Sequence, residues 1–441
     1  MKREKIGLVS LGCPKNLVDS EEMLGRLAGA GYEFTSKEEE ADLILINTCG
    51  FIESAKEESI DTILSYCERR AHGGLKGLLV TGCLAERYAG ELQSEIPEVD
   101  RFLPLREEKK IVEVVDRILS VKNPLPEEAA QTAHPQKRTI LTPFYTAYLK
   151  ISEGCSNRCA YCAIPLIRGP QKSRKNQDLV SEAEDLCERG VREIILIGQD
   201  IAGFGSDRRE PGNLIPLIRG LSQIGGLEWI RLMYVHPDHL THDLITLMAE
   251  EPKIVPYLDL PIQHINDAVL KRMNRRAGSS AIREQIKKLR KAVQGLVLRT
   301  TLMVGFPGET EDAFRELCGF VSETRFDHLG AFAYSQEEGT QAAELPDQIA
   351  DEIKTERLNT ILNLQAGISK QKNRGRVGTV QKVLVEGTSP ETDLLLSGRY
   401  YGQAPEIDGS VLINKGDAVV GEFFNVKITD AHEYDLIGEI V

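Results

Sequence analysis

Short apolar segments alternate with amphipathic segments through the first part of this 441-residue chain. The segment Ala41–Asn47 is almost continuously apolar, which is typical of a strand buried on both faces of a parallel sheet. Similar strands are expected at Lys5–Leu11 and Gly77–Thr81, with helices at Asn16–Ala30 and Ser54–Arg70. This alternation predicts a flavodoxin-like, doubly wound parallel sheet over residues 4–120.

A second alternation of strands and helices, with a longer repeat, occupies residues 141–371. Six strands are expected, at Ala147–Ile151, Glu193–Ile197, Trp229–Val235, Tyr257–Leu260, Leu298–Val304 and His328–Tyr334. These strand–helix units are too few to close an eight-stranded barrel, so they predict a partial (βα)6 TIM-like barrel. The functional side chains of such barrels gather at the carboxyl ends of the strands.

The last part of the chain, residues 373–441, has the pattern of a small all-β domain. Short strands separated by Gly, Ser, Pro and Asp are expected at Thr379–Glu386, Asp393–Ser397, Asp417–Ile428 and Leu436–Val441. They predict a small antiparallel β-barrel. A linker is expected at residues 121–140, where Pro124, Pro126 and Pro135 stand among mainly polar residues.

Three cysteines with the spacing C-x3-C-x2-C follow the first expected strand of the partial barrel: Cys155, Cys159 and Cys162. Three thiolates can hold three irons of a 4Fe-4S cluster, whereas an electron-transfer ferredoxin uses four cysteines. The open iron could bind the amino and carboxylate groups of S-adenosylmethionine, and an electron passed to its sulfonium would release a 5′-deoxyadenosyl radical. A zinc knot is the alternative, but it needs four Cys or His ligands, and no fourth lies close downstream.

Three more cysteines, Cys13, Cys49 and Cys83, each follow closely on an expected strand of the first domain. Parallel strands end at one edge of their sheet, so these thiols can meet in space, and the glycines beside them allow a cluster to come close. Three buried structural cysteines are the alternative. The remaining cysteines lie in expected helices and are interpreted as packing residues: Cys67, Cys187 and Cys318.

Polar or glycine-rich segments end three strands of the partial barrel. Gln199 follows the second strand, and the glycine-rich turn Val304–Glu309 could let the backbone approach an adenosine. Ordinary turns with helix caps have the same composition, so both interpretations stay open. His236 and His264 are interpreted as hydrogen-bonded polar residues rather than catalysts. The basic segment Lys271–Arg276 is either a solvated face or a contact for an acidic partner loop or ribosomal RNA.

The composition is that of a globular chain, with 41% hydrophobic and 27% charged residues and a net charge of −13. No apolar run is long enough to span a bilayer and no signal-peptide pattern is seen, so a cytoplasmic protein is expected. Nine cysteines in such a protein favour metal or redox chemistry over disulfides. Residues 372–441 carry 7 Lys or Arg and 11 Asp or Glu, which disfavours RNA and suits a basic protein partner.

The stretch from Ile151 through Gly169, which contains the C-x3-C-x2-C motif, resembles the core of the radical S-adenosylmethionine methylthiotransferases. The resemblance extends over nearly the whole chain. It implies a methylthiotransferase N-terminal domain, a radical SAM domain and a TRAM-like substrate-recognition domain, at residues 4–120, 141–371 and 373–441. It also implies S-adenosylmethionine and two 4Fe-4S clusters as cofactors.

The auxiliary cluster implied by this resemblance would be held by Cys13, Cys49 and Cys83 and would carry the sulfur to be transferred. A second molecule of S-adenosylmethionine would methylate that sulfur. The candidate cofactor-binding residues are Tyr161, inside the motif, and Gln199, where related enzymes contact the methionyl amino group. The implied activity inserts a methylthio group at an unactivated C–H bond. A carbon radical is short-lived, so the sulfur donor must already lie within contact distance.

The segment Ser10–Glu21, which contains Gly-Cys-Pro-Lys-Asn, resembles the ribosomal-protein aspartate type of this family. The transfer-RNA type is expected to carry Gly-Cys-Gln-Met-Asn instead. The segment Tyr434–Gly438 agrees with the ribosomal type, whereas Ile265–Ala268 departs from it. The resemblance implies methylthiolation of the β-carbon of an aspartate in the small-subunit ribosomal protein numbered twelve. The implied partners are this basic protein, a sulfur donor and an electron donor, with no membrane.

Two other functions stay open. The first is methylthiolation of a modified adenosine in transfer RNA, against which the acidic terminal domain and the Gly-Cys-Pro-Lys-Asn signature both argue. The second is a non-catalytic iron–sulfur electron carrier that docks on ribosomes. A cluster with only three cysteine ligands on a partial barrel argues against this carrier, because electron carriers close their clusters with four.

Overall fold

The computed structural model describes residues 4–120, 138–208 and 214–441, which divide into two compact units. The first unit contains Met1–Leu141, Glu153–Ser156 and Ala163–Pro170, and the second contains Thr142–Ser152, Asn157–Cys162 and Gln171–Val441. Most of the expected linker, including its three prolines, lies outside the described residues. Among the helices that the structure describes, none combines the length and apolar character needed to cross a membrane.

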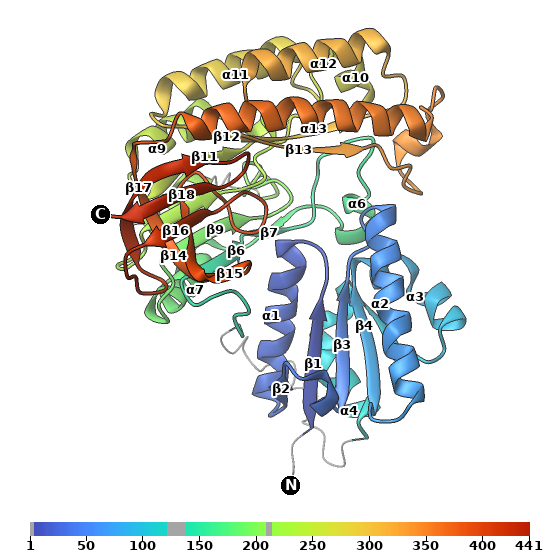
Figure 1. Cartoon of the computed structure of the whole chain (residues 1–441). Helices are drawn as coiled ribbons and strands as arrows, with labels where there is room; N and C mark the ends of the chain where they lie inside the picture. Colours follow the sequence, from blue (N-terminus) through green and yellow to red (C-terminus); the bar gives the residue numbers. More distant parts are fainter. Residues whose placement is uncertain (1–3, 121–137, 209–213) are drawn as a thin grey trace. The chain divides into compact units, whose positions relative to one another are not determined.

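A five-stranded parallel sheet forms the centre of the first unit (Figure 1). Its strands are β1 (Lys5–Ser10), β2 (Glu33–Thr35), β3 (Leu43–Thr48), β4 (Gly77–Gly82) and β5 (Arg101–Pro104). Their order is β2-β1-β3-β4-β5, with every pairing parallel. This is the flavodoxin-like strand order, so the predicted doubly wound sheet is confirmed. β3 and β4 are buried along their whole length, as their apolar sequences require.

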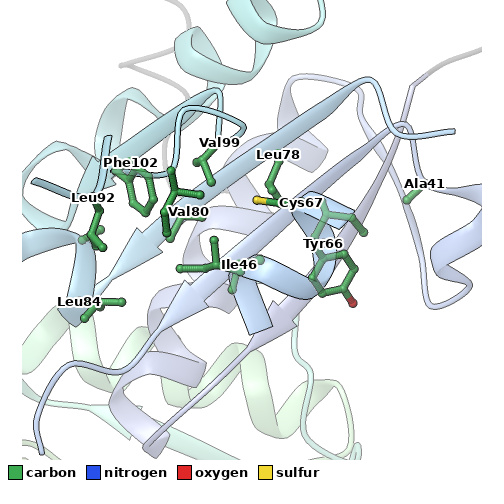
Figure 2. Close-up of a cluster of buried hydrophobic side chains, with 14 residues drawn as sticks. Ala41, Ile46, Tyr66, Cys67, Leu78, Val80, Leu84, Leu92, Val99 and Phe102 are labelled. Carbon is green, nitrogen blue, oxygen red and sulfur yellow. The ribbon is translucent and has the colours of Figure 1, made fainter. Parts of the chain in front are cut away.

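Helices cover both faces of this sheet. They are α1 (Pro14–Gly29), α2 (Glu53–Ala71), α3 (Cys83–Glu95) and α4 (Ile111–Ile118), with 3-10 turns η1 (Glu38–Glu40) and η2 (Leu105–Lys110). The short helix α6 (Ile164–Arg168) packs beside Cys83, at the start of α3. Successive side chains of a strand point to opposite faces. Ile44 and Ile46 therefore pack with residues of α2 and α3 (Figure 2), whereas Leu43 and Leu45 pack with α1 and α4. Cys67 lies in the cluster with α2 and α3, as a packing residue should.

A six-stranded parallel sheet forms the centre of the second unit. Its strands are β6 (Thr146–Lys150), β9 (Glu193–Ile197), β10 (Trp229–Leu232), β11 (Ile254–Asp259), β12 (Val297–Val304) and β13 (His328–Ala333). They lie side by side in chain order, and every pairing is parallel. The predicted set of strand–helix units is confirmed, with strand ends that differ from the predicted ones by a few residues.

Helices follow these strands along the chain: α7 (Asn176–Glu188), α8 (Leu214–Ser222), α9 (His242–Glu250), α10 (Asp267–Arg272), α11 (Ser279–Ala292) and α12 (Glu311–Thr324) lie between them, and α13 (Asp351–Arg374) follows the last one. Shorter elements are β7 (Ser152–Glu153), β8 (Lys172–Ser173), η3 (Pro237–His239) and η4 (Gln341–Glu344). The segment Ile265–Ala268 leads into α10. There the Asn266 side chain accepts hydrogen bonds from the backbone N–H groups of Ala268 and Val269, at 3.1 and 3.2 Å. Asn266 thus acts as an N-cap.

The C-terminal part of the second unit is a closed barrel of β14 (Val380–Ser389), β15 (Thr392–Tyr400), β16 (Val411–Lys415), β17 (Phe423–Ala431) and β18 (Leu436–Ile440). The predicted small β-barrel is confirmed, but it differs from the prediction in its strands and is not wholly antiparallel. The sequence prediction missed β16 and began the third strand too early, because Gly416 and Gly421 have positive φ angles and lie in the turn before β17. The β16–β18 pair is parallel, while the other pairs are antiparallel.

A buried charge network joins this barrel to the six-stranded sheet inside the second unit. Glu193 begins β9, and its carboxylate binds Arg399 of β15 at 2.7 Å and Arg231 of β10 at 2.8 Å. All three side chains are almost fully buried. Arg231 also donates a hydrogen bond to the backbone oxygen of Tyr401, at 2.7 Å. The barrel is therefore connected to the sheet by ionic contacts that water does not screen.

We expect the free energy of unfolding to depend on the ionisation of Glu193 in acid. Burial opposes ionisation, yet Arg399 and Arg231 lower the pKa of this carboxyl to about 2. A carboxyl with a lowered pKa stabilises the fold above its unfolded pKa, and this contribution is lost as the pH falls through the folded value. Urea unfolding measured between about pH 5 and about pH 2 should show a steeper loss of stability for the wild type than for Glu193→Gln. Equal pH slopes would contradict this expectation.

Candidate iron–sulfur and cofactor sites

The three cysteines of the first unit lie at the carboxyl ends of neighbouring strands. Cys13 precedes α1, Cys49 directly follows β3, and Cys83 begins α3 directly after β4. Because β1, β3 and β4 are adjacent in the sheet, the three loops come together at one edge. A Cβ atom built on Gly12 would lie 2.9 Å from the Cβ and 3.2 Å from the Sγ of Cys49. The backbone before Cys13 thus comes within contact distance of the Cys49 side chain.

The electrostatics of these thiols also show that they are neighbours. Burial raises the pKa of the Cys83 thiol to about 12, Arg168 opposes this rise, and Cys13 and Cys49 add to it. Burial likewise raises the pKa of Cys49, and Cys13 contributes to that shift. Buried thiols of this kind stay protonated until a metal displaces their protons. Three soft sulfur donors at a sheet edge are the donor set that an iron–sulfur cluster requires, so the residues present fit such a group.

Polar residues that the sequence did not single out surround this site. Asn16, Asp19 and Arg168 are buried, and Arg168 donates to the Cys83 sulfur at 3.5 Å. Asn16 and Asp19 lie in the predicted helix after Cys13, and Arg168 lies in the stretch that resembles the family core. Neither location predicts a contact with Cys83. Three-dimensional packing is what brings these side chains to the thiols.

Replacing Gly12 by alanine should weaken metal binding at these cysteines. The φ angle of Gly12 is +87°, a conformation that costs a residue with a side chain about 1–2 kcal/mol. The added methyl group would also press on Cys49. Iron content after anaerobic reconstitution should therefore fall in Gly12→Ala. Gly90→Ala is a matched control, because a Cβ there meets nothing within 4 Å. Equal iron content in both variants would contradict the prediction.

The other three cysteines lie in the loop between β7 and α6. Residues 155–163 of this loop form neither helix nor strand. Cys155 is buried, and Cys159 and Cys162 are half-buried. The spacing of these cysteines along eight residues of one loop remains the basis for predicting them as ligands of a single cluster.

Within the second unit, Cys159 has polar and aromatic neighbours. Its Sγ lies 3.8 Å from Nε2 of His236, which in turn lies 2.7 Å from Nη1 of Arg275. The His236 Nδ1 atom accepts from the backbone N–H of Asp238 at 3.2 Å, so the expectation of a hydrogen-bonded histidine is confirmed. Burial raises the pKa of Tyr161 well above its ordinary value, while the nearby Arg275 opposes this shift.

Gln199 presents a buried oxygen at the end of β9. Within the described residues, neither its Oε1 atom nor the hydroxyl of Ser152 has a hydrogen-bond partner. A buried acceptor without a donor costs about 1–3 kcal/mol, which a bound donor would remove. The ammonium group of a methionyl cofactor is such a donor. The residues present at this strand end therefore fit the predicted cofactor.

Asp200, next to Gln199, connects the cysteine loop to His236 and His239 through its carboxylate. Its carboxylate accepts from Asn157 of the cysteine loop at 2.9 Å and contacts Nδ1 of His239 at 2.5 Å. It also accepts from backbone N–H groups, including that of His236 at 3.2 Å. Asp200, His236 and His239 are close enough to hold a metal ion. These hydrogen bonds already use the carboxylate, so we interpret Asp200 as support for the loop.

The glycine-rich turn after β12 is held by its own side chains. Glu309 accepts hydrogen bonds from the backbone N–H groups of Gly305 and Phe306. Gly305 and Gly308 have positive φ angles. A Cβ on Gly305 would collide with the side chain of Lys354, and a Cβ on Gly308 with that of Arg272. His264 is fully buried nearby, and its Nδ1 accepts from Asn266 N–H at 3.0 Å. Its Nε2 has no hydrogen-bond partner among the described residues but lies 3.7 Å from Oε1 of Glu309. Contact between this turn and an adenosine stays a prediction.

Comparison with known proteins covers all parts of the chain. Family models match at residues 5–104 (uncharacterized protein family UPF0004), 149–321 (radical SAM superfamily) and 377–441 (TRAM domain). The ribosomal protein uS12 methylthiotransferase RimO of Geotalea uraniireducens is 50% identical over 446 residues, covering 100% of this chain and 99% of the relative. The protein of the same name from Geobacter sulfurreducens is also 50% identical, with the same coverage.

The chain belongs to the ribosomal protein uS12 methylthiotransferase family. As a member of this radical SAM methylthiotransferase family it is an enzyme, and the carrier alternative is set aside. Radical SAM membership implies a 4Fe-4S cluster and S-adenosylmethionine. A solved structure, the radical S-adenosylmethionine methyltransferase TsrM from Kitasatospora setae, has a TM-score of 0.55 and 13% identity, covering 87% of this chain and 81% of its own. That similarity supports the fold of this uS12 methylthiotransferase family member.

Proposed function

We propose that the chain methylthiolates the β-carbon of a specific aspartate in ribosomal protein uS12. The observation that carries this proposal is the 50% identity that spans the whole chain and nearly the whole of its relatives. The chain also has the two sets of three cysteines that two clusters with open irons would need. The proposal includes a division into domains at residues 4–120, 141–371 and 373–441.

In this proposal the two cysteine sets have different tasks. Cys155, Cys159 and Cys162 hold the cluster that, with S-adenosylmethionine bound, supplies the radical chemistry. Gln199 accepts a hydrogen bond from the methionyl ammonium, and Tyr161, a half-buried aromatic side chain within the cysteine loop, contributes to the same cofactor site. Cys13, Cys49 and Cys83 hold an auxiliary cluster that presents the sulfur.

The charge of the terminal barrel supports a protein substrate. Residues 372–441 carry 7 Lys or Arg and 11 Asp or Glu. Phosphate contacts by Lys and Arg dominate RNA affinity, so an acidic domain suits a basic ribosomal protein better than transfer RNA. A sulfur donor and an electron donor complete the reaction. We place this reaction in the cytoplasm, where ribosomal proteins are available as substrates.

The test is mass spectrometry of ribosomal proteins from cells with and without this gene. The expected result is one methylthio group on a single aspartate of uS12, which disappears in the deletion strain. Expression of the wild type or of Cys318→Ala should restore it, because Cys318 lies in α12, outside both cysteine sets. Expression of Cys155→Ala should not. An unchanged uS12 together with a missing transfer-RNA modification would assign the chain to the transfer-RNA substrate instead.

A further inference from the structure

We propose that Asn16 and Arg168 form a hydrogen-bonded brace that holds the three cysteine loops of the first unit and tunes the auxiliary cluster through Cys83. The inference rests on the proposed auxiliary cluster and adds two positioning residues to it. All residues of the brace lie in the first unit. In the chain, Arg168 follows Cys162 by six residues, but its contacts in this unit include Asn16 and Cys83 of the N-terminal cysteine site.

Asn16 connects the first two cysteine loops. Its side-chain Nδ2 donates to the backbone oxygen of Leu11 at 3.1 Å and to that of Thr48 at 2.8 Å. Leu11 lies two residues before Cys13, and Thr48 directly precedes Cys49. Asn16 is fully buried, so water does not compete for these bonds. One amide group therefore fixes the spacing of the loops that carry Cys13 and Cys49.

Arg168 connects Asn16 to the third loop. Its Nη2 donates to Oδ1 of Asn16 at 2.6 Å, to Oδ2 of Asp19 at 2.9 Å and to Sγ of Cys83 at 3.5 Å. Its Nη1 donates to Glu153 at 2.8 Å. Only 2% of the Arg168 side chain is exposed. The planar guanidinium has five N–H donors in a rigid arrangement, which lets one side chain bind several acceptors at fixed angles.

The helix that carries Arg168 is fixed by packing. Ala163 and Ile167 are buried in a small hydrophobic cluster with Cys83 and Leu105. The same segment thus contacts Cys83 through apolar atoms and through the guanidinium. A movement of α6 would change the distance between Arg168 and the Cys83 sulfur, whereas the ion pair with Asp19, also buried, resists such a movement.

The chemistry of Cys83 changes with its protonation. As a thiol, Cys83 lies 3.5 Å from Oδ1 of Asn16 and can donate its S–H to that oxygen. As a metal-bound thiolate it has no proton to donate and instead accepts from Arg168. Hydrogen bonds to cluster sulfurs and nearby positive charge favour the reduced, more negative state. Arg168 should therefore raise the reduction potential of the auxiliary cluster.

The experiment uses the full chain with Cys155, Cys159 and Cys162 replaced by alanine, so that only the auxiliary cluster can bind. After anaerobic reconstitution, the midpoint potential and the rate of iron loss to a chelator are measured. Arg168→Gln should make reduction about tenfold less favourable, which for one electron is about 59 mV. It should also speed iron loss, and Arg168→Lys, which keeps the charge but not the planar fork, should show smaller changes.

Arg70→Gln is the matched control, because Arg70 also forms an ion pair in the first unit, with Asp100 at 2.7 Å, but does not contact Cys13, Cys49 or Cys83 in the structure described. Its potential should equal that of the parent. A parent protein without iron would refute the auxiliary cluster itself. A parent with iron, but with the same potential and iron loss in Arg168→Gln, would refute the brace alone. If Arg168→Gln does not fold, the test is made with Arg168→Lys. A midpoint potential and a rate of iron loss equal to those of the parent would then overturn the inference.

Discussion

Replacing Cys13, Cys49 and Cys83 together by alanine is expected to abolish methylthiolation while cleavage of S-adenosylmethionine continues. The three thiols lie at one edge of the first unit's sheet, and in the proposed function they hold the auxiliary cluster. Alanine leaves the cluster without ligands, so the sulfur to be transferred is lost. The loop with Cys155, Cys159 and Cys162 keeps its own ligands. Iron content should fall to about half of the wild-type value, since one of two four-iron clusters is lost.

The measurement is 5′-deoxyadenosine and methylthiolated product, quantified side by side from the same reaction. The reciprocal variant, Cys155, Cys159 and Cys162 to alanine, should form neither. Cys67→Ala is the matched control, because Cys67 is a buried cysteine of the same unit that packs in a hydrophobic cluster away from the sheet edge. It should keep the wild-type iron content. A triple variant at Cys13, Cys49 and Cys83 with the full iron load would rule out the auxiliary cluster.

Replacing Glu193 by alanine is expected to reduce the free energy of unfolding by about 3–5 kcal/mol, the usual range for breaking a buried ion pair by removing one partner. Glu193 is fully buried and binds both Arg399 and Arg231. Its removal leaves two buried guanidinium groups without this carboxylate. The loss should appear as a lower denaturant midpoint with an unchanged slope.

The chain offers a matched control for this experiment. Glu228 binds Lys382 at 2.9 Å and also joins the barrel to the rest of the second unit, but both side chains are exposed by more than 40%. An exposed ion pair contributes only about 0–1 kcal/mol, so Glu228→Ala should have little effect. Equal losses for Glu193→Ala and Glu228→Ala would show that burial does not strengthen the Glu193 contacts.

Local sequence patterns were sufficient to predict the two parallel sheets and to place the six cysteines after strands of these sheets. A short, continuous apolar segment such as Ala41–Asn47 is typical of a strand in a sheet covered on both faces, so its sequence already favours the layered fold. Cysteines placed after β1, β3 and β4 must then lie at one edge. The barrel was less predictable, because the short strand β16 lies between turns and pairs in parallel with β18, a partner that no local pattern indicates.

Local sequence patterns indicated the strands of the two parallel sheets and the edge of the first sheet where three cysteines gather, because both follow from the periodicity of neighbouring residues. Tertiary structure decided which distant side chains meet. Asn16 and Arg168 are 152 residues apart, and Glu193 and Arg399 are 206 residues apart. Contacts over such separations depend on how whole elements pack, so they cannot be predicted from the spacing of residues along the chain. For this reason the cysteines could be predicted as ligands, while the residues that hold them could be found only in the folded chain.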